Sequence, residues 1–300
     1  MIDGDNLTLE MVKAVSLGSM DVSLSSDSRE RMQSSRKAVE DILDSGEVVY
    51  GINTGFGALS SVRIGDSQLE ELQSNLVRSH ACGIGGIMDP DIVLMMMTIR
   101  ANSLAKGVSG IRPSVVDTLL GMVNSRIAPS IPRIGSLGAS GDLAPLSHMA
   151  MGMMGEGECL VQVAGKWVSK DSRTALEEAG LEPVKLQAKE GLSLINGTSQ
   201  MCAYLTQTVL NMEILCLAAD ASIACSVEAI RGSHKPFDRR VHDSRPQVGQ
   251  SISAARISAF LSQSNIEISH ENCERVQDAY SFRCAPVSYT HLTLPTTSAV

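Results

Sequence analysis

The chain has 300 residues, 43% of them hydrophobic and 19% charged, and its formal net charge is −8. This balance is typical of a soluble globular protein of one or two domains, and the negative charge argues against nucleic acid as a partner. The seven cysteines are odd in number and form no CxxC pair, which argues against a disulfide framework or a zinc site.

The first ten residues, MIDGDNLTLE, lack the basic and apolar pattern of a signal peptide. The longest strongly apolar runs, 92–97 and 214–219, are much shorter than the roughly 20 residues that span a bilayer. We therefore expect a cytoplasmic protein that has no membrane partner.

Capping residues predict three helices in the first part of the chain. A helix is expected within 25–46, because serine favours the position before the first turn and glycine the position after the last. A second is expected from 66 to 80. A third is expected within 89–107, where Asp-Pro marks its start, and its apolar residues on most sides predict a core helix.

The next predicted elements are a hairpin and two helices. Segment 158–170 alternates in polarity and turns at Ala164-Gly165, which predicts a small β-hairpin. Segment 200–231 lacks both glycine and proline, so it predicts a helix long enough to belong to a bundle of long helices. A further helix is expected after Pro246. The predicted fold class is mainly α, with a small β-hairpin, leading into a long-helix bundle.

The stretch LGASGDLAPL contains three very small residues in a row, Ala139, Ser140 and Gly141. Because Gly141 has no Cβ, its backbone nitrogen can approach and attack the carbonyl carbon of Ala139, which closes a five-membered ring. Loss of that oxygen and of the Ser140 hydroxyl as two waters leaves an exocyclic methylidene, an electrophile made from the chain itself. The alternative is a glycine-rich turn that caps a helix beginning near Leu143.

The longer segment GSLGASGDLAPLSHMA, residues 135–150, resembles the signature of the aromatic amino acid ammonia-lyases. In that family the tripeptide cyclises to 4-methylidene-imidazol-5-one. The resemblance therefore implies that Ala139, Ser140 and Gly141 form this prosthetic group, with no metal and no dissociable cofactor. It extends over about residues 3–286 and implies an ammonia-lyase/fumarase-like fold.

The same resemblance gives roles to Tyr50 and His80. The segment YGINTGFG resembles the family's mobile active-site loop, in which Tyr50 would be the base. Without the resemblance, we would expect Tyr50 only to pack against neighbouring residues. A phenol with a pKa of about 10 needs a nearby positive charge or hydrogen-bond donors to act as a phenolate. Ser79-His80 resembles the pair in members that act on histidine, where His80 would exchange a hydrogen bond with the substrate imidazole. A surface histidine favoured by the helix C-terminus is the alternative.

Four further residues are candidates by resemblance. LINGTSQ resembles the family's Asn-Gly-Thr segment, in which Asn196 would help to hold the prosthetic group and the substrate; a plain turn is the alternative. QDAYSFRC places Gln277, Tyr280 and Arg283 three residues apart, so they would share one face of a helix. The resemblance implies that Arg283 binds the substrate carboxylate and that Gln277 and Tyr280 line the pocket, Tyr280 as a catalytic residue. A solvated helix face is the alternative.

The resemblance implies non-oxidative elimination of ammonia from L-histidine, giving trans-urocanate, by a homotetramer whose active sites draw on several chains. Residues 1–198 would form the N-terminal domain that carries the prosthetic group, and 199–286 the start of the central helix bundle. Two alternatives stay open. One is a phenylalanine or tyrosine ammonia-lyase or an aminomutase with the same prosthetic group, and the other is a non-catalytic, truncated helical scaffold.

The last fourteen residues, VSYTHLTLPTTSAV, contain no charged residue and no helical pattern. VSYTHLTLPT resembles the conceptual translation of a sequencing-library adapter. We therefore expect residues 287–300 to be non-native and the natural gene to continue past Pro286. The family's later active-site residues, a phenylalanine and a glutamate, would lie in that missing part.

Overall fold

The computed structural model describes residues 1–56, 60, 62–65, 68–138, 141–270 and 272–288. The chain divides into two compact units, Met1–Gln207 and Thr208–Val300, and the division falls inside one long helix. The mainly α prediction for the fold class is confirmed. The predicted domain division after residue 198 stays a prediction.

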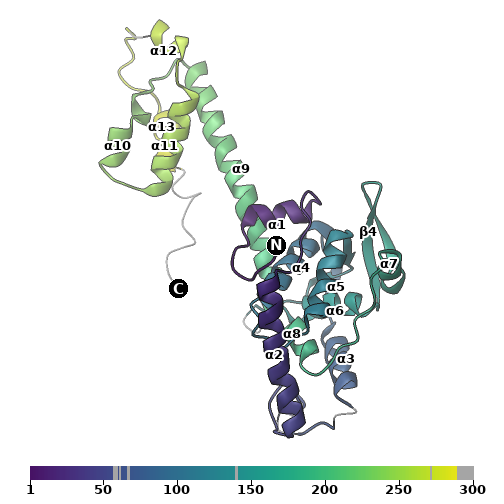
Figure 1. Cartoon of the computed structure of the whole chain (residues 1–300). Helices are drawn as coiled ribbons and strands as arrows, with labels where there is room; N and C mark the ends of the chain where they lie inside the picture. The colour runs from purple at the N-terminus through teal and green to yellow at the C-terminus, as the bar shows by residue number, and fades with distance from the viewer. Residues whose placement is uncertain (57–59, 61, 66–67, 139–140, 271, 289–300) are drawn as a thin grey trace. The chain divides into compact units, whose positions relative to one another are not determined.

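The first unit consists mostly of helices (Figure 1). Its helices are α1 Leu9–Ser16, α2 Ser26–Ser45, α3 Leu69–His80, α4 Pro90–Leu104, α5 Pro113–Asn124, α6 Leu143–Met153, α7 Ser172–Glu178, α8 Glu190–Ile195 and the first part of α9 Ser199–Ala229.

Helix α4 lies at the centre of the first unit's core. The Asp89 side chain caps it by accepting a hydrogen bond from the Asp91 backbone nitrogen (2.9 Å), and Pro90 occupies the first turn. The side chains from Met95 to Met97 are completely buried, in a core built almost entirely from aliphatic residues and methionine. The predicted core helix is confirmed, and unbranched methionine suits it because the side chain adapts to irregular space.

Helices α2 and α3 test the capping predictions. Ser25 accepts a hydrogen bond from the Ser28 nitrogen (3.2 Å) and Gly46 ends α2 in the left-handed region at φ 71°, so this prediction is confirmed. Helix α3 ends at His80 as predicted but begins at Leu69, not at residue 66, which lies outside the described residues. Its N-cap is Gln68, which makes no side-chain cap hydrogen bond.

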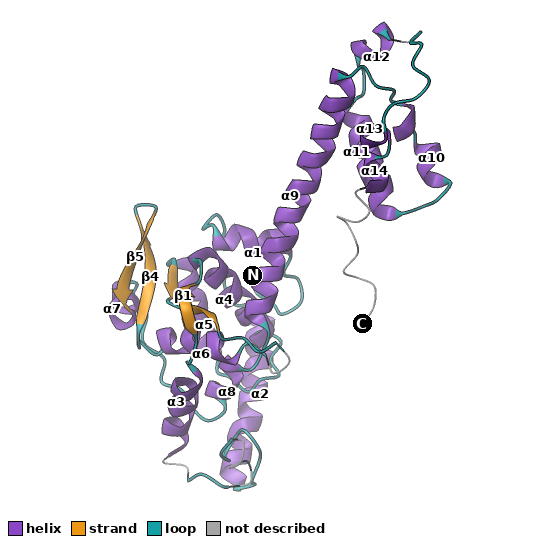
Figure 2. Ribbon diagram, turned by 180° about the vertical axis from the view of Figure 1, so that it is seen from behind, coloured by secondary structure: helices purple, strands orange, loops and turns teal. Residues whose placement is uncertain are grey.

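The predicted hairpin is confirmed as β4 Glu158–Val163 and β5 Lys166–Asp171, which pair antiparallel with Val161 opposite Val168 (Figure 2). Ala164 and Gly165 both have positive φ, which suits a two-residue hairpin turn. Strand β2 Ile127–Pro129 extends this sheet, and β1 Ile84–Ile87 pairs with β3 Pro132–Ile134 in a second one. The sequence did not predict these strands, because three or four residues are too few to show an alternating pattern.

One arginine joins the hairpin sheet to the helices. The Arg126 guanidinium lies over the Trp167 ring, 5.1 Å from its centroid, and donates to the Ser16 carbonyl oxygen and to Asp91 Oδ1 (3.1 Å). Strand β5, α1 and α4 are therefore connected through a single side chain.

The second unit contains the rest of α9 and several shorter helices. They are α10 Arg239–Asp243, α11 Val248–Phe260, α12 Asn265–Ser269, α13 Tyr280–Arg283, α14 Ala285–Ser288 and the 3₁₀ turn η3 Lys235–Phe237. Its small core gathers Phe237 and Ile257 with residues of α9. The predicted helices within 200–231 and after Pro246 are confirmed. Most of the expected non-native tail, from 289 onward, lies outside the described residues.

Helix α9 is unusually apolar. By length and hydropathy the segment Glu190–Ala229 could cross a membrane: its most apolar 18-residue window has a mean hydropathy of 1.5, and only 11% of that window is buried. Counting uninterrupted apolar runs missed this property, because isolated polar residues break the runs without lowering the average much. A single helix of this kind is also what a helical bundle requires, so it is weak evidence for a membrane.

An ion pair fixes the start of α8. Glu190 is completely buried and accepts two hydrogen bonds from the Arg112 side chain, both 2.7 Å, one from the Arg112 nitrogen (3.1 Å) and one from the Gln187 nitrogen (2.8 Å). The carboxylate raises the pKa of Arg112 above its ordinary value, chiefly through these hydrogen bonds.

We predict that Glu190→Gln destabilises the chain by roughly 3 kcal/mol, the lower end for breaking a buried ion pair, because Arg112 is 29% exposed. Denaturant unfolding followed by circular dichroism measures the change. The matched control is Asp117→Asn in the exposed Arg29–Asp117 pair, where we expect less than about 1 kcal/mol. Equal losses in the two variants would contradict the structural role given to Glu190.

Candidate active site

Two segments far apart in the sequence meet at Gly141 and Gly197. The Asp142 nitrogen donates to the Gly197 carbonyl oxygen (2.7 Å), and a Cβ placed on Gly141 would lie 2.7 Å from that same oxygen. Gly141 also has φ +90°, which L side chains rarely adopt. Only glycine therefore fits at 141, and the predicted tripeptide and the Asn-Gly-Thr segment are brought together.

The turn before Gly141 is tight. The Gly141 nitrogen donates to the Gly138 carbonyl oxygen (2.9 Å), and Gly138 has φ +68°. Ala139 and Ser140, between them, lie outside the described residues. The tight turn and the absence of a Cβ at 141 agree with the predicted ring from residues 139–141, in which the Gly141 nitrogen must approach Ala139.

The Asp142 carboxylate holds the start of α9. It is completely buried; Oδ2 accepts from the Gln200 nitrogen (2.7 Å) and the Met201 nitrogen (3.1 Å), and Oδ1 accepts from Ser136 Oγ (2.6 Å). A negative charge at a helix N-terminus is favoured by the helix dipole and satisfies free N–H groups. Asp142 precedes α6 in the sequence but makes no side-chain cap bond there.

Arg100 lies against Gly197, and no ion pair joins it to a carboxylate among the described residues. It comes from α4, is 4% exposed and donates to the Ser193 carbonyl oxygen in the last turn of α8. A Cβ on Gly197 would overlap its Nη1 atom. Burial lowers the pKa of Arg100 to about 10.

Tyr50 lies on a loop that rests against α8. A Cβ on Gly51 would lie 2.7 Å from Leu192 Cδ2, and Asn53 closes the loop by accepting from the Val49 nitrogen (2.9 Å). Tyr50 itself is 58% exposed, and its ring meets Phe56 edge to face at 6.2 Å. Within the described part of the chain its hydroxyl has no hydrogen-bond partner, and the side chain is open to solvent.

His80 is the last residue of α3, and its ring orientation is fixed. Nδ1 lies 2.9 Å from the Leu76 carbonyl oxygen and 3.1 Å from Ser79 Oγ. A carbonyl oxygen can only accept, so Nδ1 carries the proton and the neutral ring keeps a lone pair on Nε2. The helix-end interpretation and the substrate-binding interpretation are both compatible with this arrangement.

His148 on α6 anchors the segment that follows His80. The Gly83 nitrogen donates to His148 Nε2 (3.2 Å), so that atom must be unprotonated. Burial lowers the pKa of His148 below its ordinary value, which favours the neutral form that this bond needs. The position of the loop after α3 is therefore linked to α6, the helix that follows the tripeptide.

Asn196 ends α8 as its C-cap residue, with φ −94° and ψ 102°, and its side chain is exposed. Gln277, Tyr280 and Arg283 belong to the second unit. The prediction that these three share one helix face is wrong, because α13 contains only Tyr280–Arg283 and Gln277 precedes it in an irregular segment.

Within α13 the Arg283 guanidinium lies over the Tyr280 ring, 4.0 Å from its centroid, and Arg283 Nε donates to the Asp278 carbonyl oxygen (3.0 Å). Arg283 has no carboxylate partner among residues 1–288 as far as they are described.

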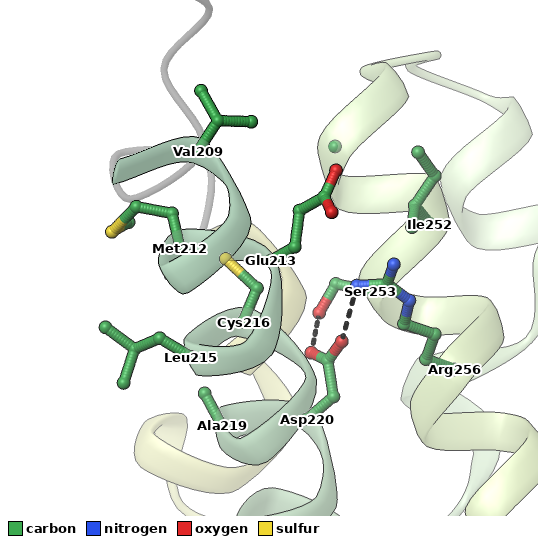
Figure 3. Close-up of a pocket in the computed structure, with 11 residues that line it drawn as sticks. Val209, Met212, Glu213, Leu215, Cys216, Ala219, Asp220, Ile252, Ser253 and Arg256 are labelled. Carbon is green, nitrogen blue, oxygen red and sulfur yellow. Dashed lines mark hydrogen bonds and ion pairs between the residues drawn. The ribbon is translucent and has the colours of Figure 1, made fainter. Parts of the chain in front are cut away.

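A cavity of about 300 Å³ lies elsewhere in the second unit, between α9 and α11 (Figure 3). Its wall is mostly apolar, and Asp220 at its edge accepts from Ser253 Oγ and pairs with Arg256 (3.7 Å). None of the predicted site residues lines it. The described residues also contain no group of three or more histidine, cysteine, aspartate or glutamate side chains that could hold a metal ion.

Sequence reasoning missed Asp142, Arg100 and His148. Asp142 stood next to the predicted tripeptide, and a buried charge between small residues could have been a signal. Arg100 was visible as the one charged residue of MMMTIRANSL, the apolar part of the predicted core helix, where a cation would be buried. His148 gave no signal, because a single histidine in the middle of a helix does not show whether the side chain is buried or which group it contacts.

Comparison with known proteins extends these observations. Residues 7–292 match the family model for aromatic amino acid lyases. The histidine ammonia-lyase of Anaeromyxobacter sp. (strain K) is 46% identical over 291 residues, covering 95% of this chain and 57% of that protein. The chain thus spans a little more than half the length of this relative.

Solved structures of ammonia-lyases and aminomutases are also similar to this chain. The crystal structure of histidine ammonia-lyase from Trypanosoma cruzi is similar with a TM-score of 0.83 at 38% identity, over 95% of this chain and 52% of that one. Tyrosine aminomutase from Streptomyces globisporus is similar with a TM-score of 0.85 at 36% identity, over 95% of this chain and 57% of that one.

We predict that His148 makes the stability of the chain depend on pH. Its folded-state pKa is lowered by burial, so the unfolded chain binds this proton more readily. The contribution is fully present above the unfolded pKa of about 6.5 and is lost as the pH falls below it. Denaturant unfolding of wild type and His148→Gln between pH 8 and pH 5 measures the difference, and a difference that stays constant with pH would contradict the assignment.

Proposed function

The chain belongs to the aromatic amino acid lyase family, and we propose that the full-length protein eliminates ammonia from L-histidine to give trans-urocanate. The observation that carries this proposal is the approach of Gly141 to Gly197, in a segment whose neighbours match the family signature. The 46% identity to a histidine ammonia-lyase supports histidine as the substrate.

The chemical problem is that the β-proton of an amino acid is barely acidic and an amine is a poor leaving group. A 4-methylidene-imidazol-5-one group formed from Ala139, Ser140 and Gly141 would supply an electrophile that improves the leaving group. Gly141 fits this role because no Cβ fills the space beside the Gly197 oxygen. The neighbouring Asn196, exposed at the end of α8, would help to hold the group and the substrate.

The chain's own side chains would position the substrate and move the proton. The accessible hydroxyl of Tyr50 would take the β-proton, and the Nε2 lone pair of His80 would accept a hydrogen bond from the substrate imidazole. Arg283, which has no carboxylate partner among the described residues, would bind the substrate carboxylate through its planar fork. Gln277 and Tyr280 would line the same pocket.

We also propose that the full-length protein is a cytoplasmic homotetramer. Helix α9 exposes Leu205, Ile214, Leu215 and Leu217, each at least 45% accessible, and such a surface is covered in most soluble proteins. A bundle of long helices from several chains would cover it. The molecular mass of the full-length protein in solution, without detergent, tests this assignment.

A second candidate is an aminomutase or an ammonia-lyase for phenylalanine or tyrosine. It is favoured by the similarity to tyrosine aminomutase at a TM-score of 0.85. The Nε2 lone pair of His80 favours the substrate imidazole, which has an N–H to donate, over a phenyl ring, which has none. The remaining alternative is a non-catalytic helical scaffold, and the mass of the peptide containing residues 139–141 distinguishes it from an enzyme.

We predict that Ser140→Ala abolishes activity in the full-length protein, because the methylidene cannot form without the serine hydroxyl. The wild-type peptide that contains residues 139–141 should be lighter than its sequence mass by two water molecules, and the Ser140→Ala peptide should not lose the second water. Peptide mass spectrometry and release of urocanate measure both. An active wild-type protein with this peptide at its full mass would refute the proposed mechanism.

We predict that His80→Leu lowers kcat/KM for histidine relative to tyrosine and phenylalanine. A site that hydrogen-bonds an imidazole loses about 1–3 kcal/mol when one partner is missing, roughly ten- to a hundredfold in the rate ratio. The experiment compares kcat/KM for the three amino acids in both proteins. If the preference for histidine is unchanged, His80 only terminates α3 and selectivity lies elsewhere.

A further inference from the structure

Arg100 differs from the other well-buried arginines of the first unit. Arg36, Arg112 and Arg126 each form an ion pair with a carboxylate, at 2.9, 2.7 and 3.1 Å. Arg100 is more deeply buried than any of them, yet its described partner is a backbone carbonyl oxygen, and its Nε atom has no hydrogen-bond partner among the described residues. Burying an unpaired cation is costly, so its position requires an explanation.

The contacts of Arg100 show what it does to the backbone. It holds the Ser193 carbonyl in the last turn of α8 and fills the space directly behind Gly197, where even a methyl group would overlap Nη1. The Gly197 carbonyl oxygen accepts from the Asp142 nitrogen and lies against Gly141. Gly197 thus contacts both the guanidinium and the residue whose nitrogen closes the ring.

We infer that Arg100 is a positioning residue for the formation of the prosthetic group: it limits the movement of Gly197 and so keeps Gly141 in the position from which its nitrogen closes the ring. The inference rests on the proposed function. In the reaction, the Gly141 nitrogen forms a bond to the Ala139 carbonyl carbon. The carbonyl oxygen leaves as water with the amide protons of Gly141 and Ser140, and the Ser140 hydroxyl leaves as a second water with its Cα hydrogen.

Nothing is oxidised or reduced in this sequence, and no co-reactant is required. The contribution of Arg100 is geometric. Removing it would let the 196–197 turn relax into the vacated space, and the Gly141 nitrogen would lose the support that fixes its position. A misplacement of about 1 Å at a reacting centre costs on the order of a hundredfold in rate.

The test follows the mass of the peptide containing residues 139–141 during cell-free synthesis of the full-length protein. We expect wild type to lose two waters, Arg100→Met to do so roughly ten- to a hundredfold more slowly, and Arg100→Lys to lie between them, because lysine keeps the charge but not the planar fork. The matched control is Arg126→Met, which removes another arginine that binds a carbonyl oxygen in the same unit and should leave the rate unchanged.

A second pair of variants keeps the inference testable if Arg100→Met does not fold. Gly197→Ala places a methyl group against Nη1 and should slow cyclisation, and adding Arg100→Lys should restore part of the rate by removing the overlap. Folded Arg100→Lys and Gly197→Ala proteins that cyclise at the wild-type rate would overturn the inference, as would a double variant no faster than Gly197→Ala.

The outcomes separate the two proposals. A wild-type protein whose peptide keeps its full mass contradicts the proposed function itself. A wild-type protein that cyclises, with variants that cyclise equally fast, contradicts only the role of Arg100.

Discussion

The site depends on one constraint, the approach of the backbone at Gly141 to the backbone at Gly197. Gly141 has no room for a Cβ, which would meet the backbone oxygen of Gly197, and a Cβ at 197 would fit only if the end of the Arg100 side chain moved. Asp142 then fixes the arrangement, because its nitrogen donates to Gly197 and its carboxylate accepts from the first turn of α9. A buried carboxylate with three donors resists displacement, since losing any partner leaves a buried polar group unsatisfied.

Helix α8, only six residues long, connects the parts of the site. Its start is held by Gln73, whose Oε1 accepts from the Gly191 nitrogen (2.9 Å), and by the Glu190–Arg112 ion pair. Its middle supports the Tyr50 loop through Leu192, and its end presents Asn196. Such a short helix is not stable by itself, so its position comes from charged and polar contacts with α3, α4 and the segment before α5.

The sequence predicted the parts of the fold whose causes are local. Ser25, Gly46 and Asp89 act on adjacent turns, so the helix boundaries that they mark could be inferred from the sequence. The hairpin turn at Ala164-Gly165 could be inferred for the same reason. The carboxylate of Asp142 could not be placed in this way, because it acts on a helix that begins 57 residues later. Gln277 was placed on a helix by its spacing alone, although the segment before α13 has no helical conformation. The roles of the site residues came from a motif, and their contacts only from the structure.

The cation over Trp167 also has a spectroscopic consequence. Trp167 is the only tryptophan in the chain, and the charge of Arg126 lies 5.1 Å from its ring. Because Arg126 also holds the end of α1 and Asp91 of α4, the indole emission depends on whether the hairpin sheet is docked on those helices. Fluorescence excited at the indole band therefore reports on the first unit selectively and without a label, because the second unit contains no tryptophan.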